Sequence, residues 1–532
     1  MRVAVVGAGA CGLGAIKGCK EEGLDVVCYE KTDNIGGLWR YRDGDEEGLA
    51  SVTKSTIINT SKEMTAISDF PPPKEYPNYM HNSMMFENIC LYAEKFDLMP
   101  HVKFHHRVER IVPADDYDST GKWTITTVNL KSTEEREETV DAVMVCTGHH
   151  VFPNIPTFPG QEKFRGSITH THSYKTPNEF EGKRVVVVGA GNSAGDAAVE
   201  TSSVAQKVYL STRSGCWVMR RVGQNGRPGD EIFTTRFINI LFNLVPLNIS
   251  SWYMERYLNK AFDHETYQLK PKHRFFQQHP MVNDALPNRI LSGTVTVKGD
   301  IERFEENGVL FKGDSEITEV DHVILATGYQ IKFPFLDKKI VDTTDNRVEL
   351  YKFVYPPHLK HPTLGIMALI QPFGGGFPIG EMQIRWFVQV LVKKVPFPSE
   401  EEMRKDIKKH LEAIGKRYYE SKRHTIQVDY IDYLDELASL IGAKPNFVKM
   451  FFTDPKLFWA LMTGPSLPYQ YRLRGPHSWS KARETILGYP ERVVSPLQTR
   501  YKVTKKVENH SILAYSVIFV VIVFLFSKII YF

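Results

Sequence analysis

The fold is set by Val3-Ala4-Val5-Val6-Gly7-Ala8-Gly9-Ala10-Cys11-Gly12, in which a run of apolar strand formers passes directly into a glycine turn. The three glycines have the G-x-G-x-x-G spacing that lets the backbone approach a pyrophosphate at the start of a helix. Residues 15–22 have a helical composition, Gly23 ends that helix, and residues 26–29 are a second buried strand. This β-α-β unit predicts an α/β domain with a parallel, doubly wound sheet.

The residue that ends the second strand indicates which dinucleotide this turn binds. Glu30 stands where a carboxylate accepts hydrogen bonds from the hydroxyl groups of a ribose. The same carboxylate would repel a phosphate on that ribose, so the site is predicted to take FAD or NAD rather than NADP.

A second strand-turn-helix pattern follows residues 184–188, at Gly189-Ala190-Gly191-Asn192-Ser193-Ala194-Gly195-Asp196. Ala194 takes the place of the third glycine, and one methyl group is expected to fit there because that position serves packing of helix on strand. The next strand ends at Ser211-Thr212-Arg213, without a carboxylate. Small hydroxyl groups and a forked arginine suit a 2′-phosphate, so this second site is predicted to bind NADP(H).

Composition and cysteine usage restrict the chemistry between the two sites. Apolar residues make up 42% of the 532-residue chain and charged residues 24%, which is typical of a folded, multidomain protein. The net charge of +4 is too small to indicate nucleic-acid binding as the main function. None of the six cysteines forms a C-x-x-C pair, so NADPH and a flavin would have no dithiol relay as the next electron acceptor. Oxygen or an electron carrier is therefore expected to take the electrons, and no metal site is expected.

The order of these units predicts an insertion of one Rossmann-like domain into another. The NADP-binding domain, residues 153–328, is expected to lie within an FAD-binding domain formed by residues 1–152 and 329–445. Residues 446–510 form a C-terminal region in which the segment 455–501 has no assigned structure.

Local patterns predict further elements. Residues 103–111 and 123–128 are expected to be antiparallel strands. Helical character begins at Ser399, which has capping-box spacing to Glu402. An apolar stripe at intervals of three follows, and we expect it to face the core: Ile431, Leu434, Leu437 and Leu440.

Residues 511–532 are predicted to be a hydrophobic membrane anchor. Their 22 residues, almost free of charge, would span about 33 Å as a helix, close to the roughly 30 Å of a bilayer core. Arg500, Lys502, Lys505 and Lys506 precede them and suit the cytoplasmic face. A buried C-terminal helix is the alternative, and the sequence does not choose between a spanning and an interfacial anchor.

Several motifs resemble those of one known family, the flavin-containing monooxygenases of the microsomal, drug-metabolising type, over essentially the whole chain. Residues 164–175 fit its signature F-x-G-x-x-x-H-x-x-x-[YF]-K, whereas the related Baeyer–Villiger class has Trp-Pro at the last two positions. The other matching segments are Glu30-Lys31, Ile35-Gly36-Gly37-Leu38-Trp39, Asn59-Thr60-Ser61-Lys62-Glu63-Met64, Ser68-Asp69-Phe70-Pro71, Gly191-Asn192-Ser193 and Ala326-Thr327-Gly328-Tyr329.

The resemblance implies an enzyme that uses FAD and NADPH, forms a 4a-hydroperoxyflavin and oxygenates the soft nitrogen or sulfur of lipophilic amines and sulfides. It implies attachment to the endoplasmic reticulum membrane, with the catalytic part facing the cytosol. It places residues 37–39 at the flavin, Ile58 and Asn59 between flavin and nicotinamide, and Thr60 among the cofactor-binding residues. The Asn59 amide is implied as the catalytic group, because it donates a hydrogen bond without releasing a proton. Gln371 is expected to line the flavin where the chain returns, with a plain loop as the alternative.

Other interpretations stay open. A Baeyer–Villiger oxygenase acting on ketones would use the same cofactors, and an NADPH-sensing membrane protein would bind them without turnover. A lone histidine is more often structural, so His170 is interpreted as packing between the two domains. His149-His150 lack a third ligand at zinc spacing and are interpreted as hinge residues. The sequence leaves open the individual substrates and whether the chain forms a homo-oligomer.

Overall fold

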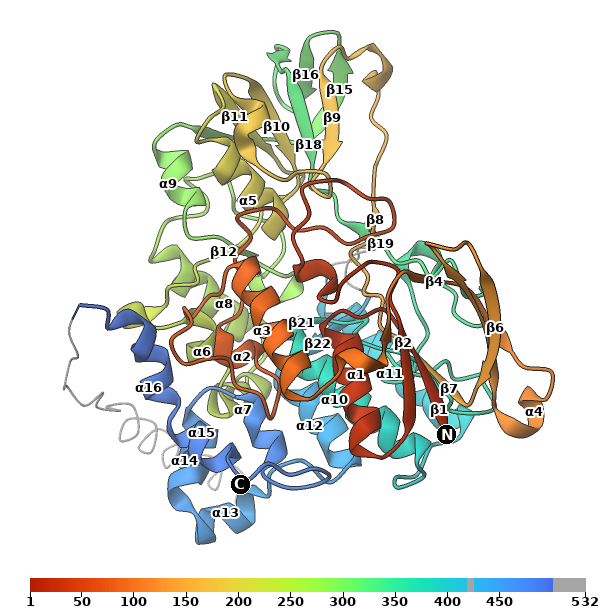
Figure 1. The fold of residues 1–532 in the computed structure, drawn as a ribbon. Coiled ribbons are helices and arrows are strands. Elements are labelled where there is room, and N and C mark those ends of the chain that lie inside the picture. Colours follow the sequence, from red (N-terminus) through yellow and green to blue (C-terminus); the bar gives the residue numbers. More distant parts are fainter. Residues whose placement is uncertain (419–424, 501–532) are drawn as a thin grey trace.

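A computed structural model describes residues 1–418 and 425–500 (Figure 1). Its first sheet has five parallel strands in the order β20-β7-β1-β2-β3. These strands are β1 (Arg2–Val6), β2 (Asp25–Tyr29), β3 (Val102–Lys103), β7 (Ala142–Val145) and β20 (Leu364–Ile366). The helix α1 (Ala10–Glu21) connects β1 to β2, as the opening β-α-β pattern predicts.

A second sheet, also of five parallel strands, has the order β14-β11-β10-β18-β9 and lies at the top of Figure 1. Its strands are β9 (Ser167–His170), β10 (Arg184–Val188), β11 (Lys207–Ser211), β14 (Val295–Lys298) and β18 (His322–Leu325), and α5 (Asn192–Thr201) connects β10 to β11. The first sheet takes strands from both sides of this region of the sequence. The two-sheet α/β architecture is therefore confirmed, while the domain boundaries given above stay predictions.

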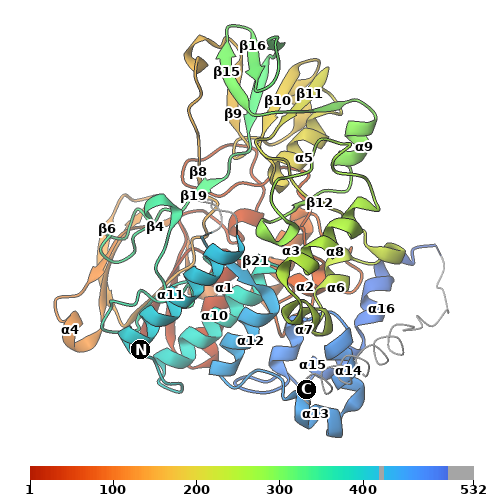
Figure 2. The same ribbon diagram turned by 180° about the vertical axis from the view of Figure 1, so that it is seen from behind.

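The chain passes between the two sheets through one short ladder. β8 (Phe152–Pro153), where the chain leaves the first sheet, pairs antiparallel with β19 (Tyr329–Gln330), where it returns. Figures 1 and 2 show this ladder between the two sheets in both views.

Antiparallel sheets flank the parallel ones. β4 (His106–Pro113), β5 (Trp123–Asn129) and β6 (Glu135–Val140) form one of them, which confirms the expected pair, although β4 begins three residues later than predicted. β15 (Ile301–Glu305), β16 (Gly308–Phe311) and β17 (Thr318–Glu319) form another beside the second sheet. Two short parallel ladders pair β12 (Val218–Met219) with β13 (Met281–Val282) and β21 (Gln371–Phe373) with β22 (Gln427–Asp429).

Helices that follow the second sheet in sequence return to cover the first. α10 (Gly376–Leu391) packs on α1, where Ile384 meets Gly14 and Gly18. α11 (Glu400–Arg417) begins with the predicted capping box, since the Ser399 hydroxyl accepts from the Glu402 N–H and the Glu402 carboxylate accepts from the Ser399 N–H.

The predicted apolar stripe lies on α12 (Tyr430–Leu440), and its first three members are buried. Its last member was wrongly assigned to the core: Leu440 is 40% exposed because the helix ends there. The remaining helices are α2 (Lys62–Thr65), α3 (Asn82–Lys95), α4 (Tyr117–Thr120), α6 (Gly229–Phe233), α7 (Arg236–Leu244), α8 (Leu247–Asn259), α9 (Leu286–Leu291), α13 (Phe447–Thr453), α14 (Pro455–Thr463), α15 (Ala482–Leu487) and α16 (Tyr489–Val494). The last three lie within the segment left unassigned from sequence.

Within the described residues, no helix combines the length and the apolar character needed to cross a membrane. The predicted anchor, residues 511–532, lies outside them.

Candidate active site

The first glycine turn leaves the start of α1 open to an anion. Gly7 has a φ of +96°, and a Cβ there would lie 3.1 Å from the carbonyl oxygen of Cys146. A Cβ on Gly12 would lie 1.8 Å from the carbonyl oxygen of Gly7, so only glycine lets the helix pack this closely on the turn. Among the described residues no side chain caps α1 at Gly9, and its first turn holds no acidic residue. The unpaired N–H groups and the helix dipole therefore favour a pyrophosphate.

Glu30 is buried beside this turn and holds its shape. Its Oε2 accepts from the Ala8 N–H at 2.8 Å. Its Oε1 accepts from the Thr32 N–H at 2.9 Å and from the Thr32 hydroxyl at 2.8 Å. Because a carboxylate oxygen has two lone-pair sites, Oε2 keeps the capacity to accept from a ribose hydroxyl.

The first glycine turn and Glu30 both line a cavity of about 1010 Å³, which we call the main cavity. A Cβ on Gly37 would lie 3.1 Å from the Cα of Gly9, so these two glycines leave space that any side chain would fill. Ala8 and Gly12 do not line the main cavity, since Ala8 is buried behind it. The predicted cofactor residues that do line it are Gly7, Gly9, Ala10, Cys11, Glu30, Gly37, Leu38, Trp39, Ile58, Asn59, Thr60, Asn192 and Gln371. This cradle of glycines, free helix N–H groups and a carboxylate fits the adenosine diphosphate part of FAD.

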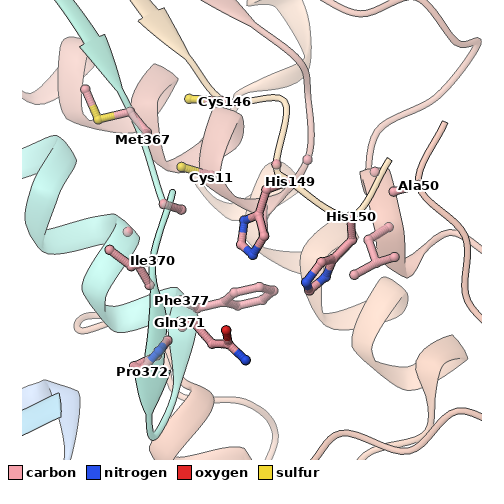
Figure 3. Close-up of a pocket in the computed structure, with 18 of the residues that line it drawn as sticks. Cys11, Ala50, Cys146, His149, His150, Met367, Ile370, Gln371, Pro372 and Phe377 are labelled. Carbon is pink, nitrogen blue, oxygen red and sulfur yellow. The ribbon is translucent and has the colours of Figure 1, made fainter. Parts of the chain in front are cut away.

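Two histidines that the sequence analysis treated as hinge residues line the main cavity as well. The rings of His149 and His150 lie 4.3 Å apart between centroids. Figure 3 shows them projecting toward the space that Gln371 and Phe377 also face. They follow β7, and in open parallel sheets ligands bind at the carboxyl ends of the strands, which is the signal that could have placed them here.

The Asn59 side chain is fixed by an arginine from the inserted region. Arg221 Nη2 donates to Asn59 Oδ1 at 2.7 Å, and Arg221 Nε donates to the carbonyl oxygen of Ile58 at 3.3 Å. Because a guanidinium only donates, this contact determines which end of the amide is the oxygen. Within the described part of the chain Asn59 Nδ2 has no acceptor, so it stays available as a donor in the cavity wall. Arg221 also pairs with Asp284, Nη1 to Oδ2 at 3.2 Å.

Sequence reasoning missed Arg221, because 162 positions separate it from Asn59 and no motif marks it. It missed the aromatic wall of the main cavity for the same reason. Phe275 and Phe276, with ring centroids 4.9 Å apart, pack near Phe373 and Phe242. All four line the cavity together with Phe233, so a large apolar molecule has a surface to contact there.

A second cavity, of about 1500 Å³, lies at the other glycine turn. It is lined by Gly189, by the Ser211-Thr212-Arg213 segment and by Lys272, a cation that no sequence pattern indicated. Ser211 does not match the expectation of a free hydroxyl, since its Oγ is buried and donates to the Gly299 carbonyl oxygen at 2.9 Å. The Thr212 hydroxyl accepts from the Gly215 N–H at 3.0 Å and keeps its own proton to donate. Arg213, Thr212 and Lys272 are thus the groups that could hold a phosphate.

The other residues predicted at the second turn include a buried core residue and two side chains that form hydrogen bonds within the protein. Ala194 is fully buried in the core of the second sheet, so its methyl group is accommodated as expected. Asn192 Oδ1 accepts from the Val282 N–H at 2.7 Å, and Asp196 Oδ1 accepts from Asn283 Nδ2 at 2.9 Å. Burial raises the pKa of Asp196 to about 6. Neither cavity is lined by Gly191, Ser193, Ala194, Gly195 or Asp196.

The signature segment 164–175 ties the two sheets together. Lys175 Nζ donates to the Ser51 hydroxyl at 2.5 Å, and the Lys175 carbonyl oxygen accepts from the Lys54 N–H at 3.0 Å. His170 packs edge-on against Tyr329, and burial lowers the pKa of His170 to about 4. A neutral, packed ring agrees with a structural role for His170.

Comparison with known proteins identifies the family. The family model for flavin-binding monooxygenase-like proteins matches residues 1–532. The chain is 48% identical over 501 residues to flavin-containing monooxygenase 5 of Rattus norvegicus, covering 94% of this chain and 93% of that protein. It is 45% identical over 501 residues, with the same coverage, to dimethylaniline monooxygenase [N-oxide-forming] 2 of Cavia porcellus.

Solved structures share the fold. An S-allyl-L-cysteine S-oxygenase from Allium sativum has a TM-score of 0.63 at 24% identity, covering 91% of this chain and 98% of that one. A cyclohexanone monooxygenase has a TM-score of 0.59 at 17% identity, covering 83% of this chain and 98% of that one. With the family match and the close relatives, the chain belongs to the flavin-containing monooxygenases, enzymes that use FAD and NADPH.

Proposed function

We propose that this monooxygenase oxygenates the soft nitrogen or sulfur of lipophilic small molecules, giving N-oxides and S-oxides. The observation that carries the proposal is the Asn59 amide in the cavity wall, whose oxygen is held by Arg221 while its N–H groups have no acceptor among the described residues. When bound and reduced by NADPH, the flavin supplies activated oxygen to the substrate.

The task of Asn59 in this proposal is to donate a hydrogen bond without losing a proton. A carboxamide does not ionise near neutral pH, so it orients a polar group without acting as an acid. Arg221 keeps the amide from rotating, because a rotated amide would turn its NH₂ group toward the guanidinium. The aromatic wall formed by Phe242, Phe275, Phe276 and Phe373 excludes water and favours apolar substrates.

Asn59→Ala tests this role. The flavin should still be bleached by NADPH, because the groups at the second glycine turn are unchanged. Product formed per NADPH should fall several-fold, the effect of losing one hydrogen bond of about 1 kcal/mol, while hydrogen peroxide rises to match. The control is Asn129→Ala, the same truncation outside the lining of the main cavity. Unchanged coupling in Asn59→Ala would remove Asn59 from the chemistry.

Product analysis tests the substrate class. A thioether and a ketone offered together should yield mainly the sulfoxide, because an electrophilic, uncharged oxidant reacts with soft sulfur, whereas attack on a ketone needs an anionic, nucleophilic oxidant. Ester as the main product would replace the proposal with Baeyer–Villiger oxygenation. A bound flavin that NADPH does not bleach would point instead to a protein without turnover.

We also propose that residues 511–532 attach the enzyme to the endoplasmic reticulum membrane, with the catalytic part in the cytosol. Their apolar sequence and the four basic residues before them support this placement. A chain ending at residue 510 should leave the microsomal fraction while a full-length chain stays; equal distribution of the two would contradict the proposal.

A further inference from the structure

The inserted region contacts the turn that carries Asn59 at a second point besides Arg221, and this second contact is made by Asp230. Asp230 Oδ2 accepts from the Ser61 N–H at 2.7 Å. Asp230 Oδ1 accepts from the Tyr79 hydroxyl, with 3.1 Å between the oxygens. Asp230 lines the main cavity, and Ser61 stands two residues after Asn59, at the start of α2.

Tyr79 connects this carboxylate to Arg221. Its hydroxyl lies 2.8 Å from the carbonyl oxygen of Arg221 and accepts from the Gly229 N–H at 3.2 Å. One hydroxyl proton is thus shared between Asp230 and the Arg221 backbone. Arg221 and Asp230, which both contact the Asn59 turn, are joined through this single hydroxyl.

The backbone on either side of Tyr79 runs beside the same turn. The Ile58 N–H donates to the Met80 carbonyl oxygen at 3.0 Å, and the Lys62 N–H donates to the Asn78 carbonyl oxygen at 2.7 Å. These contacts hold the ends of the segment 58–62, whereas the Ser61 N–H between them depends on Asp230.

We propose that Asp230 and Tyr79 are positioning residues, which complete a closed hydrogen-bonded ring around the turn and thereby fix the Asn59 amide for coupled oxygenation. The ring runs from Asn59 to Arg221, through Tyr79 to Asp230, and back to the turn at Ser61. The inference rests on the proposed role of Asn59. A rigid ring matters because a catalytic donor displaced by about 1 Å loses much of its effect.

The neighbouring acid, Glu231, has a donor of its own. Glu231 is buried and accepts from the Tyr489 hydroxyl. Burial and the nearby Asp230 raise the pKa of Glu231. Burial also raises the pKa of Asp230, whose carboxyl group has the Ser61 N–H and the Tyr79 hydroxyl as donors.

Hydrogen exchange of the full-length holoenzyme tests the ring without using turnover. In Asp230→Ala the Ser61 N–H loses its acceptor, and its exchange should become about tenfold faster. Asp230→Asn supplies an amide oxygen in the same place, so exchange should return close to the wild-type rate. Tyr79→Phe removes the hydroxyl that joins Asp230 to Arg221 but leaves the Asp230 acceptor of the Ser61 N–H in place, so it should accelerate exchange less. Tyr471→Phe is the control, since it removes a buried hydroxyl bound to Asp435 at 2.8 Å and does not line the main cavity.

Coupling, which is the amount of product formed per NADPH consumed, is measured on the same variants. Asp230→Ala and Tyr79→Phe should release several-fold more peroxide per product, with an unchanged rate of flavin reduction by NADPH, and Asp230→Asn should restore coupling. If Asn59→Ala is uncoupled, either of two results in Asp230→Ala would overturn the inference. One is unchanged exchange of the Ser61 N–H, and the other is faster exchange with unchanged coupling. If Asn59→Ala stays coupled, the proposed role of Asn59 fails and positioning by Asp230 fails with it. Should Asp230→Ala not fold, Tyr79→Phe decides the result.

Discussion

Replacing Arg213 with alanine should separate the affinity for NADPH from the affinity for NADH. The two cofactors differ only in the 2′-phosphate. Arg213 follows β11, is exposed, and lines the second cavity beside Gly189 and Thr212. The Ser211 hydroxyl is already used by Gly299, so Arg213 carries more of the phosphate recognition than the sequence implied.

The size of the effect follows from the number and exposure of the contacts. A hydrogen bond to a charged group contributes about 1.5–3 kcal/mol, which corresponds to about 10–150-fold in affinity. Arg213 is exposed, and solvent screening reduces the value of an exposed charge pair. Lys272 also remains in the cavity. We therefore expect NADPH to bind about 10–30-fold more weakly, with NADH unchanged.

The assay is anaerobic stopped-flow bleaching of the flavin at increasing concentrations of each cofactor, which gives an apparent Kd for both. Arg136→Ala is the control, because Arg136 is also exposed, pairs with Glu134, and does not line the second cavity. Arg213→Ala combined with Lys272→Ala should weaken NADPH further, and added salt should reduce the difference between wild type and variant. Equal losses for NADPH and NADH, or no loss for either, would refute the assignment of Arg213 to the phosphate.

Three further predictions concern the scaffold. Gly12→Ala would place a Cβ 1.8 Å from the Gly7 carbonyl oxygen and should yield protein without flavin absorbance, whereas Gly415→Ala, with no atom within 4 Å of its Cβ, should keep its flavin. His264 is buried, its Nε2 accepts from the Val218 N–H at 3.0 Å, and burial lowers its pKa from 6.5 to about 4. Below pH 6.5 the His264 side chain becomes protonated in the unfolded chain, whereas it stays neutral in the folded protein down to about pH 4. The free energy of unfolding should therefore fall by about 2 kcal/mol for this group between pH 7 and pH 5. Thermal melts of His264→Gln should show a smaller decrease between these pH values than wild type or the surface variant His358→Gln, and an equal decrease would contradict it. Ser399→Ala removes the cap of α11 and should cost about 1 kcal/mol, measured as a lower urea midpoint, while the exposed Ser132→Ala should not shift it.

Much of the scaffold could be predicted because its signals are local. The turn at 7–12 needs glycine for backbone reasons that act within a few residues, and the capping box at Ser399 joins residues three positions apart. Such contacts depend on the order of residues and little else. Leu440 shows where this reasoning ends, because helical spacing does not reveal that the helix stops at that residue.

Only those residues of the candidate site that lie in sequence motifs could be predicted. Glu30, Asn59 and the glycines stand in recognisable segments, whereas Arg221, Tyr79 and Asp230 have no motif around them. Arg221 and Asp230 meet the Asn59 turn only because the inserted region folds back onto the first domain, where Tyr79 joins them.

By itself the sequence determined the two strand-glycine-helix turns and the lack of a C-x-x-C pair, and it predicted different ribose chemistry for the two turns, since each of these depends on residue types at short spacing. Only the tertiary structure decided which atoms hold the Asn59 amide, which hydroxyl groups at the second turn are already engaged, and which aromatic side chains form the wall of the main cavity. The physical reason is that hydrogen bonds and packing act over a few ångströms in space. Partners separated by more than a hundred positions in the chain come within that range only after both domains have folded.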